Sequence, residues 1–166
     1  MDLKKLTLAA LLVALGAMAA TMVVVPFAGA RLFPVQHAIN VVAAVLLGPW
    51  YGVLMAFSVS LLRNLLGTGT LLAFPGSMIG VFLAAVVYQR TKCTLKAVIG
   101  EVLGTGILGA LVAFPVARFL LGRDVAALVF VMPFFLSSLS GGLIAYALIA
   151  TLKVKVLKKL GLSEQS

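Results

Sequence analysis

Three polar side chains stand close together at the head of a long apolar run, in the stretch FPVQHAINVVAAVLLGPWYG at 33–52. Gln36 and Asn40 are four residues apart and therefore share one face of a helix, with His37 beside them. Amide and imidazole groups donate and accept hydrogen bonds. The sequence offers no nucleophile with a base and no metal-ligand cluster to accompany them. The chemistry that this stretch favours is therefore binding, not bond cleavage.

Further polar and aromatic residues occur near the ends of later apolar runs. A small-molecule pocket has mostly apolar walls and a few placed donors and acceptors, and this set supplies both. Asp124 is the one acid expected nearby, so a small neutral or weakly anionic heteroaromatic ligand suits the set better than a strongly cationic one. The candidate substrate-binding residues are Gln36, His37, Asn40, Arg63, Asn64, Phe74, Ser77, Ser137 and Ser138.

Each candidate also has an explanation that needs no ligand. His37 can donate to a loop carbonyl, and Arg63 can reach the lipid headgroups or pair with Asp124. Serines in apolar helices often bond to their own backbone. Glu101 stands near Lys96 at the start of another apolar run. We expect these two to form an ion pair, and we favour this over a proton relay.

The composition indicates which elements must position these residues. Of the 166 residues, 63% are hydrophobic and 10% are charged, in apolar blocks separated by short polar breaks. Backbone groups in lipid must be satisfied within the chain, so we expect an all-α integral membrane protein, a compact bundle of six transmembrane helices. The net charge of +9 lies mostly between or after apolar blocks, which indicates membrane topology and not nucleic-acid binding. A lone cysteine, Cys93, excludes an intrachain disulfide framework.

The expected fold is a single membrane domain over 1–166, with spans at about 6–25, 34–48, 51–66, 76–89, 97–121 and 127–152. Gly48-Pro49 interrupts one long run, so the second and third spans are either one kinked helix or two helices. Basic residues favour the cytoplasmic side, and lysines near both chain ends therefore require an even number of spans. Six spans place both termini in the cytoplasm. The second span is then only about 22 Å long and should be shielded by its neighbours or by a thinner bilayer.

The first apolar run is longer than the core of a secretory signal, so we expect it to be a retained span. It carries Ala10-x-x-x-Ala14, and the fifth span carries Gly100-x-x-x-Gly104. Small residues four apart let helices approach closely, either within the bundle or against a partner subunit. The sequence has no phosphate-binding loop, no paired intramembrane carboxylates and no evident internal repeat. We therefore expect no cofactor in this chain, and energy for any transport to come from a partner.

Two motifs carry a resemblance to a known family. PVQHAINVVAAVLLGPWYG and LLRNLLGTGTLLAFPGSMIG, with six short spans and the Ala-x-x-x-Ala first helix, resemble the substrate-binding S-component of energy-coupling factor (ECF) vitamin transporters, in particular the ThiW branch. The resemblance covers nearly the whole chain. It implies a protein of the prokaryotic plasma membrane, not an enzyme, that captures the thiamine precursor hydroxyethylthiazole from outside.

The resemblance also implies partners and a mechanism. Ala10 and Ala14 would face a transmembrane coupling subunit, and two ATPase subunits would use ATP to drive release inside. A loop at 26–35 would close the site. The matching motif positions imply binding by Gln36, His37, Asn40, Arg63, Asn64 and Ser77.

Within such a site, we expect His37 or Asn40 to donate to the ring nitrogen of the thiazole. Arg63 or Asn64 would hold its hydroxyl, and Phe74 would stack on its ring. Two alternatives stay open at this point. One is an S-component for another small vitamin or precursor, and the other is a small integral-membrane enzyme or assembly protein.

Overall fold

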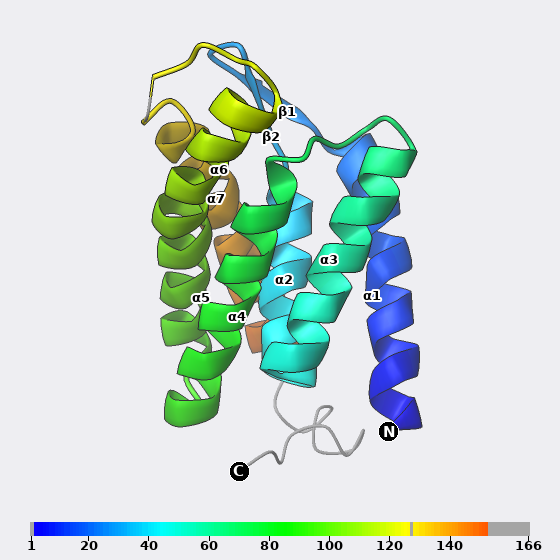
Figure 1. Cartoon of the computed structure of the whole chain (residues 1–166). Coiled ribbons are helices and arrows are strands. Elements are labelled where there is room, and N and C mark those ends of the chain that lie inside the picture. The colour runs from blue at the N-terminus through cyan, green and yellow to red at the C-terminus, as the bar shows by residue number, and fades with distance from the viewer. Residues whose placement is uncertain (1, 127, 153–166) are drawn as a thin grey trace.

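The structure is a computed structural model that describes residues 2–126 and 128–152. The four tail lysines on which the charge argument partly depends, at 153, 155, 158 and 159, lie outside the described residues. The described residues form six continuous helices. They run up and down the bundle (Figure 1). They are α1 (Leu3–Met22), α2 (Pro34–Leu47), α3 (Pro49–Leu65), α4 (Ala73–Thr91), a fifth continuous helix (Thr94–Leu120) and α7 (Val131–Thr151).

The fifth helix changes its winding along its length. It consists of α5 (Thr94–Leu103), the π-helical segment η1 (Gly104–Gly109), α6 (Ala110–Pro115) and a second π-helical segment, η2 (Val116–Leu120). π-Helical turns are rare and frequently occur at functional sites. The first of them contains Thr105, which is buried.

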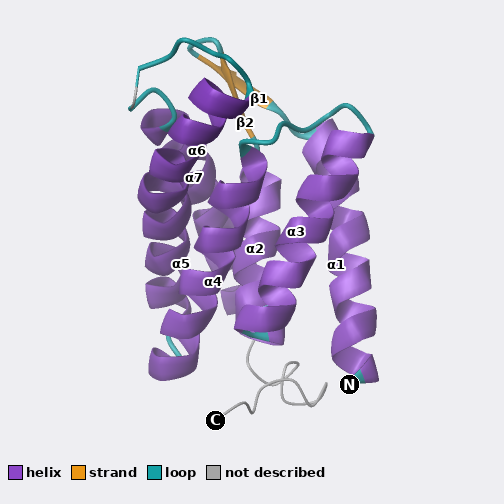
Figure 2. Ribbon diagram, in the orientation of Figure 1, coloured by secondary structure: helices purple, strands orange, loops and turns teal. Residues whose placement is uncertain are grey.

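A short β-hairpin, which the expected all-helical fold did not include, occupies the 26–35 loop (Figure 2). The strands β1 (Val25–Phe27) and β2 (Ala30–Leu32) pair antiparallel through a two-residue turn, Ala28-Gly29. Both turn residues have positive φ, as tight hairpin turns require. The hairpin lies at one end of the bundle, with the α3–α4 loop and the loop that follows Leu120 (Figure 1). We call this the hairpin end; the N-terminus of α1 lies at the opposite end.

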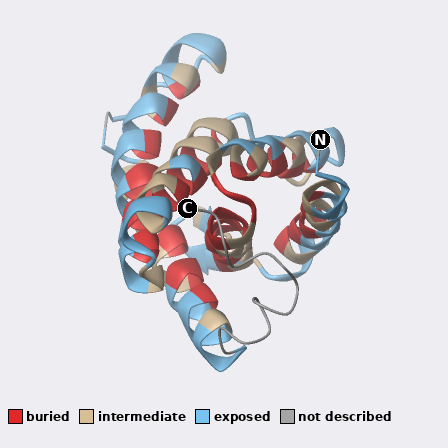
Figure 3. Ribbon diagram, turned by 90° about the horizontal axis from the view of Figure 1, so that it is seen from below, coloured by how far each residue is buried: buried red, intermediate tan, exposed pale blue. Residues whose placement is uncertain are grey.

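Gly48-Pro49 separates two helices, so the six-helix interpretation is confirmed over the single kinked span. Gly48 has φ 79°, which favours glycine, and Pro49 begins α3 where its missing N–H costs nothing. The resulting helix α2 has 14 residues, or about 21 Å of length. Most of them are buried, and Figure 3 shows from below that the buried residues of the bundle gather on the inward sides of the helices. The expected shielding of this short helix is therefore confirmed; its buried residues are Pro34, Gln36, His37, Ala38, Asn40, Val41, Ala43, Ala44, Val45 and Leu47.

Three of the described helices are long and apolar enough to cross a membrane: Leu3–Met22, Thr94–Leu120 and Val131–Thr151. Their number and composition suggest a multi-pass membrane protein. In α1 and in α7, only 28% of the most apolar 18-residue stretch is buried. In the fifth helix the buried share of that stretch is 61%. Helices α1 and α7 therefore lie at the edges of the bundle, with wide apolar faces directed outward.

The small residues of the fifth helix serve packing within the bundle. A Cβ on Gly104 would lie 2.7 Å from the Cα of Gly80, and one on Gly100 would lie 3.1 Å from the Cα of Ala84. The fifth helix and α4 therefore cross with their backbones almost in contact. Ala10 and Ala14 differ, because both are exposed on the outer face of α1.

Candidate substrate-binding site

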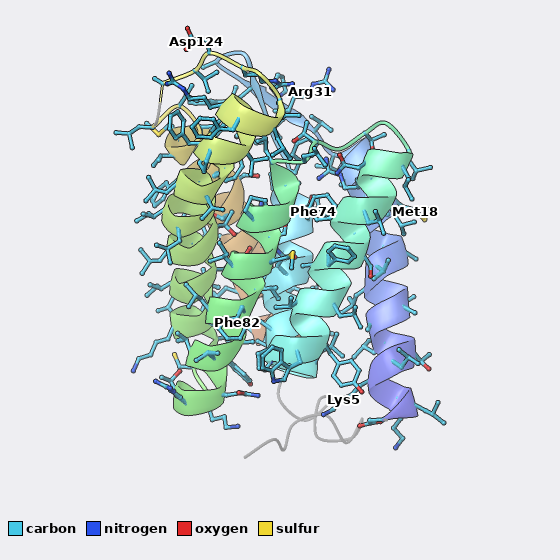
Figure 4. All side chains as sticks on the ribbon, in the orientation of Figure 1. Lys5, Met18, Arg31, Phe74, Phe82 and Asp124 are labelled. Carbon is cyan, nitrogen blue, oxygen red and sulfur yellow. The ribbon has the colours of Figure 1, made fainter. Side chains whose placement is uncertain are left out.

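A cavity of about 690 Å³ opens at the hairpin end of the bundle. Its walls come from the hairpin, the first turns of α2, α4 and α7, the loop after α3 and the loop after the fifth helix. The volume falls within the range usual for small-molecule sites. Figure 4 shows Arg31 and Asp124 at this end and Lys5 at the opposite end.

The described lining of the cavity contains three arginines and no carboxylate. Arg31 and Arg123 are exposed, whereas Arg63 is 1% exposed. Asp124 is exposed and is not part of the lining. The described lining therefore offers no carboxylate to balance the charge of a cationic ligand.

Arg63 lies at the centre of a buried polar network. Its guanidinium donates to the Gln36 side-chain oxygen and to the Thr68 carbonyl, the latter over 3.0 Å, and lies 4.0 Å from the ring centre of Phe33. Gln36 in turn donates to Ser77 Oγ over 2.6 Å. Arg63 therefore neither reaches the headgroups nor pairs with Asp124, and it joins α2, α3 and the hairpin junction beneath the cavity.

Glu101 corrects one expectation from the sequence. It is fully buried, and its Oε1 lies 2.9 Å from His37 Nδ1, 3.0 Å from Asn40 Nδ2 and 3.1 Å from Thr105 Oγ1. Lys96 is exposed, so the expected ion pair between Lys96 and Glu101 is wrong. The two are five residues apart, which places them on different faces of the helix.

Five of the nine candidate residues line the cavity: Gln36, His37, Arg63, Ser77 and Ser137. Ser137 also anchors the hairpin junction, because its hydroxyl accepts from the Phe33 backbone N–H over 2.7 Å. These five come from α2, α3, α4 and α7, which are far apart in the sequence.

The other four candidates lie outside the described lining. Asn40 donates to Glu101, deeper along α2. Asn64 donates to the Ser60 and Thr70 carbonyls and so holds the α3–α4 loop. The Phe74 ring packs 5.4 Å from Phe57, between centroids, and Ser138 bonds to its own helix through the Phe134 carbonyl.

Sequence reasoning did not include Thr105 and Glu101 among the site residues. Thr105 lines the cavity and bonds to Glu101, and the two are four residues apart on one helix face. The sequence did contain one indication of this pair. Glu101 is an ionisable residue inside an apolar run, and such residues most often have a functional partner. Phe130 also lines the cavity, and no pattern in the sequence indicates it.

An apolar six-helix bundle with a mostly apolar cavity and a few polar groups at one end is typical of a membrane protein that binds a small molecule. The chain belongs to the ThiW family: the family model described as "Thiamine-precursor transporter protein (ThiW)" matches residues 6–155. The family is one of transporters and not of enzymes. No curated protein and no solved structure matches the chain significantly.

Proposed function

We propose that this protein is the substrate-capture subunit, or S-component, of an ECF-type importer, and that it binds hydroxyethylthiazole from outside the cell. The observation that carries the substrate assignment is the charge of the cavity. Three arginines and no carboxylate belong to its described lining, beside the apolar walls that Phe33, Phe130 and Phe134 contribute. Such a site disfavours a cation and suits an uncharged or weakly anionic heteroaromatic ring.

The same charge separates a thiamine precursor from thiamine. Thiamine carries a permanent cation on its thiazolium ring, and the described lining of the cavity, which includes Arg63, offers that cation no carboxylate. Hydroxyethylthiazole has the same ring without that charge, together with one hydroxyl and one ring nitrogen. A few donors and acceptors within an otherwise apolar site are sufficient to orient so small a ligand.

The orientation in the membrane follows from the proposed role. Capture from outside requires the hairpin end to face outward and the chain termini to face the cytoplasm. Among the described basic residues, Lys4, Lys5, Arg90, Lys92 and Lys96 lie toward the opposite end, against the exposed Arg31, Arg118 and Arg123 toward the hairpin end. This difference supports the orientation, since basic residues favour the cytoplasmic side. The hairpin is the segment that would close over the bound ligand.

Binding to the purified protein tests the proposal. Calorimetric titrations in detergent micelles would compare hydroxyethylthiazole, thiamine and the pyrimidine precursor of thiamine. We expect hydroxyethylthiazole to bind, and thiamine to bind at least about tenfold more weakly because its cation is not compensated. Tighter binding of another vitamin, with none of the thiazole, would favour the alternative that this is an S-component for a different small compound.

A further inference from the structure

The chain's single histidine is held by one nitrogen and faces the cavity. His37 Nδ1 lies 2.9 Å from Glu101 Oε1, and His37 belongs to the lining of the cavity. The same carboxylate oxygen accepts from Asn40 Nδ2 over 3.0 Å, which fixes its position between α2 and the fifth helix. The ring nitrogen left to meet a ligand is therefore Nε2.

The groups around His37 favour the form of the ring whose hydrogen is on Nδ1, because Glu101 Oε1 already accepts from Asn40 Nδ2. Three ionisable side chains are buried near the cavity: Arg63, Glu101 and His37. Arg63 has no carboxylate within ion-pairing distance among the described residues, and Glu101 has only His37. The charges of Arg63 and Glu101 offset each other if His37 is neutral, whereas a protonated His37 would leave a net buried positive charge. A neutral ring facing a carboxylate carries its hydrogen on Nδ1.

Other polar groups of the lining are already engaged or act as donors. The Gln36 side chain accepts from Arg63 and donates to Ser77. The hydroxyls of Ser77 and Ser137 each accept one hydrogen bond, so each keeps its own hydrogen to donate. With the hydrogen on Nδ1, His37 Nε2 differs from these groups because it is then a basic nitrogen that can only accept.

We propose that Glu101 is a positioning residue that holds His37 in the Nδ1–H form, so that Nε2 accepts a hydrogen bond from the hydroxyl of the substrate. This rests on the proposed function, and it names a heteroaromatic alcohol as the ligand class. It reverses the expectation from the sequence, in which His37 donates to the ring nitrogen and Arg63 or Asn64 holds the hydroxyl. The serine hydroxyls then serve the ring nitrogen.

Two ligands and three proteins test the assignment. The ligands are hydroxyethylthiazole and the analogue with an ethyl group in place of hydroxyethyl. We expect the wild type to prefer the alcohol by about tenfold, the contribution of one good hydrogen bond. In Glu101→Leu, which has no acceptor for Nδ1, the preference should fall to about twofold or less. Glu101→Gln, whose amide oxygen can still accept from Nδ1, should keep most of it.

The comparison of ligands separates positioning from packing. If Glu101→Leu weakens both ligands by the same factor, Glu101 only supports the fold and the proposal is overturned. Binding of the ethyl analogue reports that a variant is folded. A wild type that binds neither ligand would overturn the proposed function, and the His37 assignment would then be decided by the following measurement.

Nitrogen NMR of the single histidine needs no ligand. In wild-type protein labelled with ¹⁵N-histidine and purified without a polyhistidine tag, only His37 contributes a signal. We expect a protonated Nδ1 and a bare Nε2 at neutral pH. Two protonated nitrogens, or a proton on Nε2 alone, would overturn the proposal whether or not Glu101→Leu folds.

Discussion

At the scale of single residues, Arg63 is a charged side chain whose burial is costly. It is 1% exposed; its two terminal nitrogens donate to the Gln36 side-chain oxygen and the Thr68 carbonyl, its plane lies over Phe33, and its Nε has no hydrogen-bond partner among the described residues. The flat guanidinium suits this arrangement, because it donates in two directions while it stacks on a ring. A lysine has the same charge but neither the fork nor the plane.

We therefore predict that Arg63→Lys lowers the affinity for hydroxyethylthiazole by about tenfold or more, through the loss of the Gln36 and Thr68 contacts that shape the cavity. Titration of the purified variant measures the change. Arg118→Lys is the matched control, because Arg118 is exposed and lies outside the lining. Equal affinity of Arg63→Lys and the wild type would contradict a role for the guanidinium geometry.

The sequence indicated several of the residues that line the cavity, but it was less informative about the role of each one. Gln36 and His37 follow from the helical spacing at the head of an apolar run, and both line the cavity. Asn64 and Phe74 stood in equally suitable places, yet one caps a loop and the other packs on Phe57. That difference depends on the rotation of each helix about its axis, which packing between helices sets and which a pattern of residue types does not contain.

At the scale of elements, α1 and the fifth helix use small residues in opposite ways. Gly100 and Gly104 lie against the backbone of α4, so they pack within the bundle and are not accessible to a partner. On α1, the buried face includes Gly16 and Ala17, which leaves Ala10 and Ala14 directed outward. The outward face also carries large side chains with high exposure; these include Leu11, Leu15 and Met18, the last of which Figure 4 labels. Ala10 and Ala14 form a strip of small side chains between these larger ones. A partner helix can approach the α1 backbone closely along such a strip.

A bulky residue in that strip provides the test of partner binding. We predict that Ala14→Leu prevents stable association with the transmembrane coupling subunit, since a leucine would hold the partner helix away from the α1 backbone. Affinity for hydroxyethylthiazole should stay within about twofold, because the cavity lies at the hairpin end. Co-purification with the coupling and ATPase subunits, and uptake of labelled thiazole, measure the effect.

The matched control for this experiment is Ala147→Leu, the same change at an exposed alanine of α7, the other edge helix. The complex and the uptake should survive it. Loss of both binding and complex formation in Ala14→Leu would mean that the strip serves only the stability of the bundle.

At the scale of the whole molecule, the apolar blocks and the even-span rule predicted six helices, and the part of the chain that the structure describes forms six. This succeeded because the length of an apolar run is fixed by the bilayer and depends little on tertiary contacts. The hairpin and the two π-helical segments were not predicted. Strands of three residues are too short to show an alternating pattern, and β1 is exposed throughout. They are held by contacts with distant residues, such as the bond from the Phe33 N–H to Ser137.

The orientation of the bundle can be tested with a residue that the chain already contains. Cys93, the only cysteine, is partly exposed at the turn between α4 and α5, at the end opposite the cavity. If the cavity faces outward, a membrane-impermeant thiol reagent should label Cys93 only after cells are permeabilised. A Cys93→Ser, Asp124→Cys variant, with its cysteine at the exposed hairpin end, should react in intact cells. Labelling of Cys93 in intact cells would place the cavity on the cytoplasmic side, and a protein so oriented is unable to capture its substrate from outside.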